Sequence, residues 1–241
     1  MATGAELLGS RGSDLRVEQH ERGDGRATRA QAGPGLRRFD RDQTGAGPGD
    51  VLSSGPMSTT QRHTLFLTTS SREPGHPGNS EWLARQAAAA LPAGSTQTWL
   101  ALAHMNLPPF VDLRHTVGQY PAPEGDLKTL LDATLAATDI VFVSPVYWFS
   151  IPAPLKTYLD HWSGWLRVPG LGFKEQMAGK TLRVISTSGD RAKAQPMFDS
   201  LRLCAQFLAM NWGGELWGKG GAPGAVQADT EAVAQAATFL L

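Results

Sequence analysis

Cysteine is almost absent from this sequence, since Cys204 is the only one in 241 residues. A single cysteine cannot form a disulfide within the chain, so the fold does not depend on a disulfide framework. Because disulfide-free proteins are typical of reducing compartments, we expect a cytoplasmic protein. Long apolar runs are also missing, and the sequence therefore predicts neither a membrane span nor a secretory signal.

An excess of charge of either sign is missing as well. The chain has 22 basic and 22 acidic residues, and its formal net charge is zero. Residues 1–56 carry 8 arginines and 8 acidic residues, which leaves 14 basic and 14 acidic residues for the remainder. Both parts are thus neutral. No basic segment favours nucleic acid as a partner.

The first quarter of the chain lacks the residues that build a core. Residues 1–60 contain no Trp, Tyr or Lys and a single aromatic residue, Phe39, whereas all seven tryptophans lie at Trp82 or beyond. Such a segment cannot bury enough apolar surface to offset its chain entropy. We predict a disordered extension over residues 1–62 and one folded domain over residues 63–241. Met57 is a candidate initiator, and an over-extended start and a genuine extension both remain open.

Several catalytic signatures are missing from the predicted domain. It has no G-x-S-x-G elbow and no H-E-x-x-H pair, so the sequence gives no support to a serine or zinc hydrolase. Its histidines have no metal-ligand spacing with Cys, Asp or Glu, and no metal is expected. The P-loop and the G-x-G-x-x-G fingerprint are absent too, which excludes the two commonest nucleotide-binding loops.

What the domain does contain is a regular alternation of short apolar runs and helical patterns. Five such pairs predict an α/β fold: a doubly wound, five-stranded parallel sheet between two helical layers. We expect the flavodoxin-like strand order 2-1-3-4-5 and a ligand between the first and third strands, where the order reverses. The predicted strands are 64–68, 96–101, 140–144, 180–186 and 214–217, and the predicted helices are 80–91, 126–137, 153–165, 196–210 and 228–240.

The loop after the first predicted strand has the composition of an anion site. Small hydroxyl residues, an arginine and a glycine precede the start of a helix, whose free N–H groups and dipole favour a phosphate. An ordinary loop with an Asn or Ser helix cap is the alternative. The candidate residues are Ser70, Arg72, Gly78, Asn79 and Ser80.

Two further loops follow the third and fourth predicted strands. The continuous apolar run from Ile140 to Val143 indicates a strand buried on both faces, and an aromatic loop comes directly after it. Its backbone amides and aromatic rings suit a flat, polar-edged ring system, although core or dimer contacts would also use such aromatics. The loop after the fourth strand consists of residues with small side chains, which leave room for the edge of that ring. The candidates are Pro145, Val146, Tyr147, Trp148, Phe149 and Ser150 in one loop, and Ser186, Thr187, Ser188 and Gly189 in the other.

One stretch also resembles a known family. Ser-Pro-x-Tyr-Trp-x-Ser-x-Pro-Ala-x-Leu-Lys, from Ser144 to Lys156, is similar to the isoalloxazine-binding loop of the NAD(P)H-dependent FMN reductases and quinone reductases of the flavodoxin-like superfamily. The loop after the first strand resembles their phosphate loop, with a Pro-Gly-His-Pro segment that lengthens it. The resemblance is looser over the rest of residues 63–241.

The resemblance implies an oxidoreductase that binds FMN and uses NADPH or NADH as co-substrate. Electrons would pass to a small acceptor such as a quinone, a nitro or azo compound, or free flavin, in a homodimer. The flavin carries the chemistry in this family, so no catalytic side chain is expected. The alternative is a flavodoxin-type electron carrier that binds FMN without oxidising NAD(P)H. Such carriers are usually strongly acidic, unlike this neutral domain.

Overall fold

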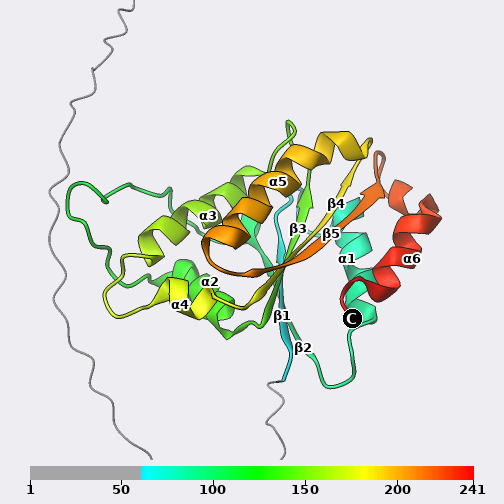
Figure 1. The fold of residues 1–241 in the computed structure, drawn as a ribbon. Coiled ribbons are helices and arrows are strands. Elements are labelled where there is room, and N and C mark those ends of the chain that lie inside the picture. The colour runs from blue at the N-terminus through cyan, green and yellow to red at the C-terminus, as the bar shows by residue number, and fades with distance from the viewer. Residues whose placement is uncertain (1–60) are drawn as a thin grey trace, which may run out of the picture. The chain divides into compact units, whose positions relative to one another are not determined.

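A single parallel sheet organises the protein in the computed structural model, which describes residues 61–241 (Figure 1). All neighbouring strands are parallel, in the order β2-β1-β3-β4-β5, which confirms the predicted fold class. Met57 and the predicted extension up to residue 60 lie outside the described residues. The strands are β1 (His63–Thr68), β2 (Thr96–Ala101), β3 (Asp139–Pro145), β4 (Thr181–Ser188) and β5 (Asn211–Lys219).

Helices cover both faces of the sheet. Helices α1 and α6 lie on one face, and α2, α3, α4 and α5 lie on the other (Figure 1). Within residues 61–241, no helix is both long and apolar enough to cross a membrane. The helices are α1 (Asn79–Ala89), α2 (Gly125–Ala136), α3 (Ala153–Trp165), α4 (Phe173–Met177), α5 (Arg191–Phe207) and α6 (Thr230–Phe239), with 3-10 turns η1 (Leu102–His104) and η2 (Ala225–Ala228).

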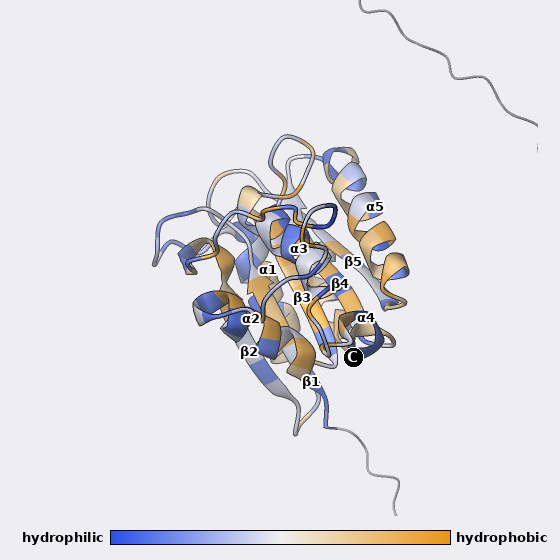
Figure 2. Cartoon of the chain, turned by 90° about the vertical axis from the view of Figure 1, so that its left-hand side faces the viewer, coloured by the Kyte–Doolittle hydropathy of each residue, from blue (hydrophilic) through white to orange (hydrophobic). Residues whose placement is uncertain are grey.

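Alternation along the central strands fills two separate cores. In β1, Leu65 and Leu67 point to the layer of α2 to α5, whereas Phe66 between them points to the layer of α1 and α6. Successive side chains of a strand face opposite sides of a sheet, so a strand buried on both sides must be apolar throughout. Figure 2 shows the hydrophobic residues concentrated in these central strands and on the inward sides of the helices.

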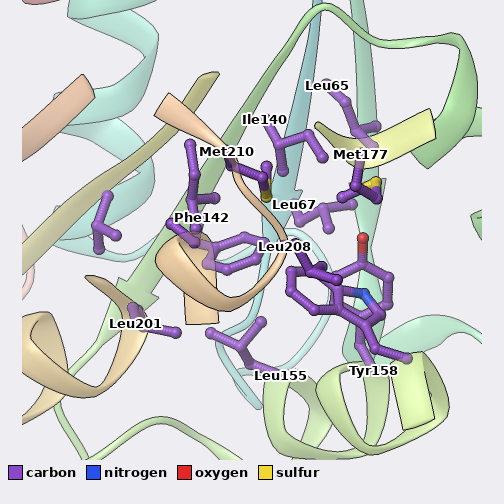
Figure 3. Packing of buried hydrophobic residues seen from close by; sticks show 14 of the residues in the cluster. Leu65, Leu67, Ile140, Phe142, Leu155, Tyr158, Met177, Leu201, Leu208 and Met210 are labelled. Carbon is purple, nitrogen blue, oxygen red and sulfur yellow. The ribbon is translucent and has the colours of Figure 1, made fainter. Parts of the chain in front are cut away.

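The larger core lies under α3 and α5. Phe142 and Leu155 meet Tyr158 there, and Leu201 and Met210 close the cluster from the α5 side (Figure 3). The Tyr158 hydroxyl is fully buried, but it lies 2.8 Å from the Thr134 hydroxyl, so its polar atom is satisfied. Burial raises the pKa of Tyr158 well above its ordinary value and keeps the phenol neutral.

The sequence prediction differs from the structure mainly in α5 and β5. Helix α5 begins at Arg191, five residues before the predicted start at Pro196, because the Asp190 carboxylate accepts a hydrogen bond from the Ala192 N–H and caps it. Pro196 lies inside the helix on its exposed side, where water can reach the carbonyl that the proline leaves unbonded.

Strand β5 is longer than predicted, because a bulge carries the chain through Gly213 and Gly214. Its register with β4 shifts between Leu182 and Val184, and Gly214 has φ of +97°. A Cβ at Gly213 would lie 2.5 Å from the Arg183 side chain, so only glycine fits there. The short helix α4 carried no sequence signal and was not predicted.

One buried carboxylate, that of Asp139, is the shared hydrogen-bond acceptor at the amino end of the sheet. Asp139 at the start of β3 accepts hydrogen bonds from Arg62 at 3.0 and 3.2 Å, from the Thr138 hydroxyl at 2.9 Å, and from Arg183. Arg62 also donates to the Leu240 carbonyl and so fastens the end of the chain beside β1. Burial alone would raise the pKa of Asp139, but these donors outweigh it and hold the pKa below its ordinary value.

We predict that Asp139→Asn lowers the free energy of unfolding by about 2–3 kcal/mol at neutral pH, because Arg62 and Arg183 lose the negative charge with which both are paired. A lowered pKa in the folded state stabilises above about pH 4, the ordinary range of an unfolded carboxyl, and this contribution disappears as the pH falls through the folded value. Urea unfolding of both proteins from pH 7 to pH 3 should therefore show the difference shrinking on acidification. The control is Asp132→Asn, whose carboxylate pairs with Lys128 on an exposed helix face and should change stability by less than about 0.5 kcal/mol.

Candidate functional site

A cavity of about 500 Å³ opens at the carboxyl edge of the sheet, where the strand order reverses between β1 and β3. Parallel α/β sheets bind ligands at this position, because the two neighbouring loops leave the sheet in opposite directions. The ends of β1, β3 and β4, the start of α1 and the loop after β5 line the cavity. Nine of the predicted residues are among its walls: Ser70, Arg72, Gly78, Asn79, Ser80, Pro145, Thr187, Ser188 and Gly189.

The first turn of α1 supplies free hydrogen-bond donors to this cavity. Gly78 at the N-cap offers no side-chain cap, and the N–H groups of Asn79, Ser80 and Glu81 donate to no acceptor within residues 61–241. Arg72 folds back over this helix end, with its Nε 3.5 Å from where a Cβ of Gly78 would lie. Three open amides, a helix dipole and a guanidinium together form a site for an anion, and for a phosphate above all.

The side chains of Asn79 and Ser80 are not free in the structure, because they hydrogen-bond the start of α1 to segments that are distant in the sequence. Asn79 Nδ2 donates to the Ala222 carbonyl at 3.0 Å, beside the loop after β5. The Ser80 hydroxyl lies 2.8 Å from the Thr187 hydroxyl and accepts from the Thr187 N–H at 3.1 Å. These bonds orient the free amides of α1. Any direct contact of the two side chains with a ligand stays a prediction.

The aromatic loop after β3 forms a two-residue turn that projects beyond the cavity. Tyr147 and Ser150 exchange two backbone hydrogen bonds of 3.0 Å, and Trp148 and Phe149 between them have φ of 50° and 63°. Positive φ at both central positions is the geometry of a type I′ turn, which ordinarily needs Asn-Gly. Two aromatic residues therefore hold a strained backbone there.

This turn exposes its rings instead of burying them. The exposed fraction is 93% for Trp148 and 55% for Phe149, and the connection from β3 to α3 stands above the sheet in Figure 1. Of the aromatic stretch, only Pro145 lines the cavity. Val146, Tyr147, Trp148, Phe149 and Ser150 lie next to it along the chain but are not among its walls.

The loop after β4 contributes its last residues and not its first. Ser186 is fully buried in β4 and does not line the cavity, whereas Thr187, Ser188 and Gly189 do. The Ser188 hydroxyl accepts from Trp217 Nε1 at 2.8 Å and donates to the Asp190 carbonyl at 2.7 Å, so it stiffens this loop. The predicted loop is therefore present at the cavity, shifted by one residue along the chain.

Two parts of the cavity wall were not predicted from the sequence. Gly220 and Gly221 follow β5, and a Cβ at Gly220 would lie only 3.0 Å from the Thr187 side chain. The glycine pair directly after an apolar strand was the available signal. At the opposite end, Arg85, Trp99 and His104 come from α1, β2 and η1, and no local motif marks them.

The comparisons with known proteins agree with this geometry. A family model described as "Flavodoxin-like fold" matches residues 62–238. The chain is 30% identical to YwqN of Bacillus subtilis, a candidate NAD(P)H-dependent FMN-containing oxidoreductase, over 166 residues that cover 68% of this chain and 90% of that protein.

Two solved structures show the same fold. The Trp repressor binding protein of Bacillus subtilis has a TM-score of 0.56 at 24% identity, covering 73% of this chain and 96% of its own. The FMN-dependent NADH-azoreductase of Bacillus anthracis, solved with FMN, has a TM-score of 0.54 at 16% identity, covering 75% of this chain and 96% of its own. Because the family model matches residues 62–238 and a relative that is 30% identical is covered over 90% of its length, the chain belongs to the flavodoxin-like family that the loop from Ser144 to Lys156 resembles.

Proposed function

We propose that the protein is an FMN-dependent NAD(P)H oxidoreductase that passes electrons from a reduced nicotinamide to a small acceptor. The observation that carries this proposal is the uncapped start of α1, with three open amides beside Arg72, in a cavity that continues to Pro145 and Gly189. The 30% identity to YwqN supports the same activity. Quinones, nitro or azo compounds and free flavin are the acceptor classes we propose.

The residues present fit an FMN molecule. The open amides of Asn79 to Glu81 and the guanidinium of Arg72 would hold its phosphate, and the chain at Pro145 and Gly189 would border its ring. When bound, the flavin accepts a hydride and returns electrons, so the protein needs to bind, orient and shield it.

A flavodoxin-type carrier is the second candidate, and the charge balance disfavours it. Residues 57–241 hold 14 basic and 14 acidic residues, so the domain lacks the net negative charge that such carriers use to attract a redox partner. We further propose a cytoplasmic homodimer. The exposed rings of Trp148 and Phe149, on a turn whose backbone is strained, support the dimer, because a second subunit would cover apolar surface that a monomer leaves in water.

Direct reduction by a nicotinamide tests this function. With FMN bound and oxygen excluded, NADH or NADPH should bleach the flavin absorbance without any partner reductase, and a quinone should restore it. The carrier alternative predicts that dithionite bleaches the flavin and neither nucleotide does. A protein that takes up no FMN at all would contradict both functions.

Arg72 provides a test of the phosphate site. We expect Arg72→Gln to weaken FMN binding by at least about tenfold, because a charge-assisted contact to a phosphate is worth about 1.5–3 kcal/mol. Flavin fluorescence quenching on titration of the apoprotein measures this. Arg114→Gln is the control, since Arg114 is an exposed arginine that pairs with Asp112 away from the cavity. Equal FMN affinity in the two variants would place the phosphate elsewhere.

The strained turn gives a prediction in which stability and activity change in opposite directions. Replacing Trp148 with Asn and Phe149 with Gly installs the residues that a type I′ turn prefers, and should raise the free energy of unfolding by about 1–2 kcal/mol. The same change removes the rings beside the flavin site, and we expect kcat/KM for the nicotinamide to fall at least fivefold. A more stable variant with full activity would show that the aromatic rings have no part in function.

A further inference from the structure

Three side chains form a continuous stack at the β2 end of the cavity. The rings of Phe66 and Trp99 lie 4.1 Å apart at their centroids and are 5° from parallel. The guanidinium carbon of Arg85 lies 3.6 Å from the centroid of the Trp99 ring. Both distances are too short for two groups on one face of the indole, so Arg85 covers the face that Phe66 leaves free. The stack runs from the core outward and ends in a planar cation.

This stack is rigid at its base and open at its end. Phe66 is fully buried in β1, and Glu81 accepts a hydrogen bond from Arg85 at 3.0 Å, which fixes the guanidinium plane along α1. The Arg85 side chain is nevertheless 51% exposed. Its outer face is therefore available, since Trp99 occupies the inner one. A guanidinium plane presented in this way is a platform for a planar, electron-rich ring, and it stacks well on nucleobases.

The position of the platform suggests which ring it receives. Arg85 and Trp99 line the same cavity as the anion site of α1 and Arg72, but at the end away from Ser188 and Gly189. A ligand whose ring borders Pro145 and whose phosphate lies at α1 leaves this end of the cavity free. The space beyond the FMN phosphate therefore ends at a base-stacking platform, which suits the adenine of a dinucleotide whose other half reaches the flavin ring.

We propose that Arg85, stacked on Trp99, is the binding platform for the adenine of the nicotinamide dinucleotide. This inference rests on the proposed function, because it assigns the half of the co-substrate that does not react. The same platform chemistry would suit the adenylate half of FAD. The nicotinamide dinucleotide and FAD share this half, which is adenosine 5′-phosphate joined to a second nucleotide. The guanidinium then determines specificity and takes no part in the redox step.

The test compares ligands with and without adenylate on the FMN-loaded protein. We expect kcat/KM for NADH to exceed that for reduced nicotinamide mononucleotide by at least tenfold in the original protein. In Arg85→Ala the NADH value should fall about tenfold toward the mononucleotide value, which itself should change by less than twofold. Arg85→Lys should behave like Arg85→Ala, because lysine keeps the charge and loses the plane.

The chain offers a closely matched control in Arg202. It lies on α5, pairs with Asp199 one helical turn away, and has its guanidinium 5.9 Å from the Trp212 ring, yet it does not line the cavity. Arg202→Ala should leave both nicotinamide values unchanged. A matching loss in Arg202→Ala would identify the effect of Arg85→Ala as a general one on the fold.

Two binding measurements keep this inference separate from the proposed function. Adenosine 5′-phosphate should bind the FMN-loaded protein in calorimetry, and Arg85→Ala should abolish that binding even if no nicotinamide reduces the flavin. The affinities for FAD and FMN identify the source: a loss for FAD alone in Arg85→Ala, with NADH unaffected, would assign the platform to the flavin. If adenosine 5′-phosphate, NADH and FAD are all insensitive to Arg85, the inference is wrong.

Discussion

The site depends on the pair of hydrogen bonds that joins Ser80 to Thr187. They connect the first turn of α1 to the end of β4, residues that are 107 positions apart in the chain. Because both residues are buried, this connection is shielded from water and holds a fixed geometry. Asn79 adds the loop after β5 through Ala222. Three loops from different parts of the sequence thus meet around one helix end, which keeps its free amides aimed at the cavity.

The two edges of the sheet have different roles: polar groups at the amino edge are paired within the fold, and the carboxyl edge carries the candidate binding site. At the amino edge, Asp139 accepts hydrogen bonds from Arg62, Thr138 and Arg183, so its carboxylate is paired within the fold. At the carboxyl edge, the amides at the start of α1 have no acceptor in the part of the chain that the structure describes. Unsatisfied donors lower stability unless a ligand completes them.

The fold class and the strand order could be predicted from the sequence, because apolar runs and their alternation with helical patterns are local features. The run from Ile140 to Val143 identified β3, and the five repeated units predicted the strand order that the sheet adopts. The errors have physical reasons that the pattern of apolar residues does not contain. The carboxylate of Asp190 started α5 early, and the bulge at Gly213 carried β5 through a segment that would otherwise end a strand.

The site was predicted less completely, because it is assembled by contacts between distant residues. The loop compositions placed nine residues at the cavity, but they could not show that the Ser80 hydroxyl is engaged by Thr187 or that Trp148 points into water. The Arg85–Trp99 pair was missed because its members lie 14 positions apart on a helix and an edge strand. Only the packing of α1 beside β2 brings them together.

The exposure of Trp148 has a spectroscopic consequence. Six of the seven tryptophans are at least partly buried, whereas Trp148 is almost wholly in water. An indole in water emits at longer wavelength than a buried one, and dissolved iodide or acrylamide reaches it easily. The long-wavelength, quencher-sensitive part of the protein's fluorescence should therefore come from this one ring. Its response to concentration or to a bound ligand would report directly on what approaches the mouth of the site.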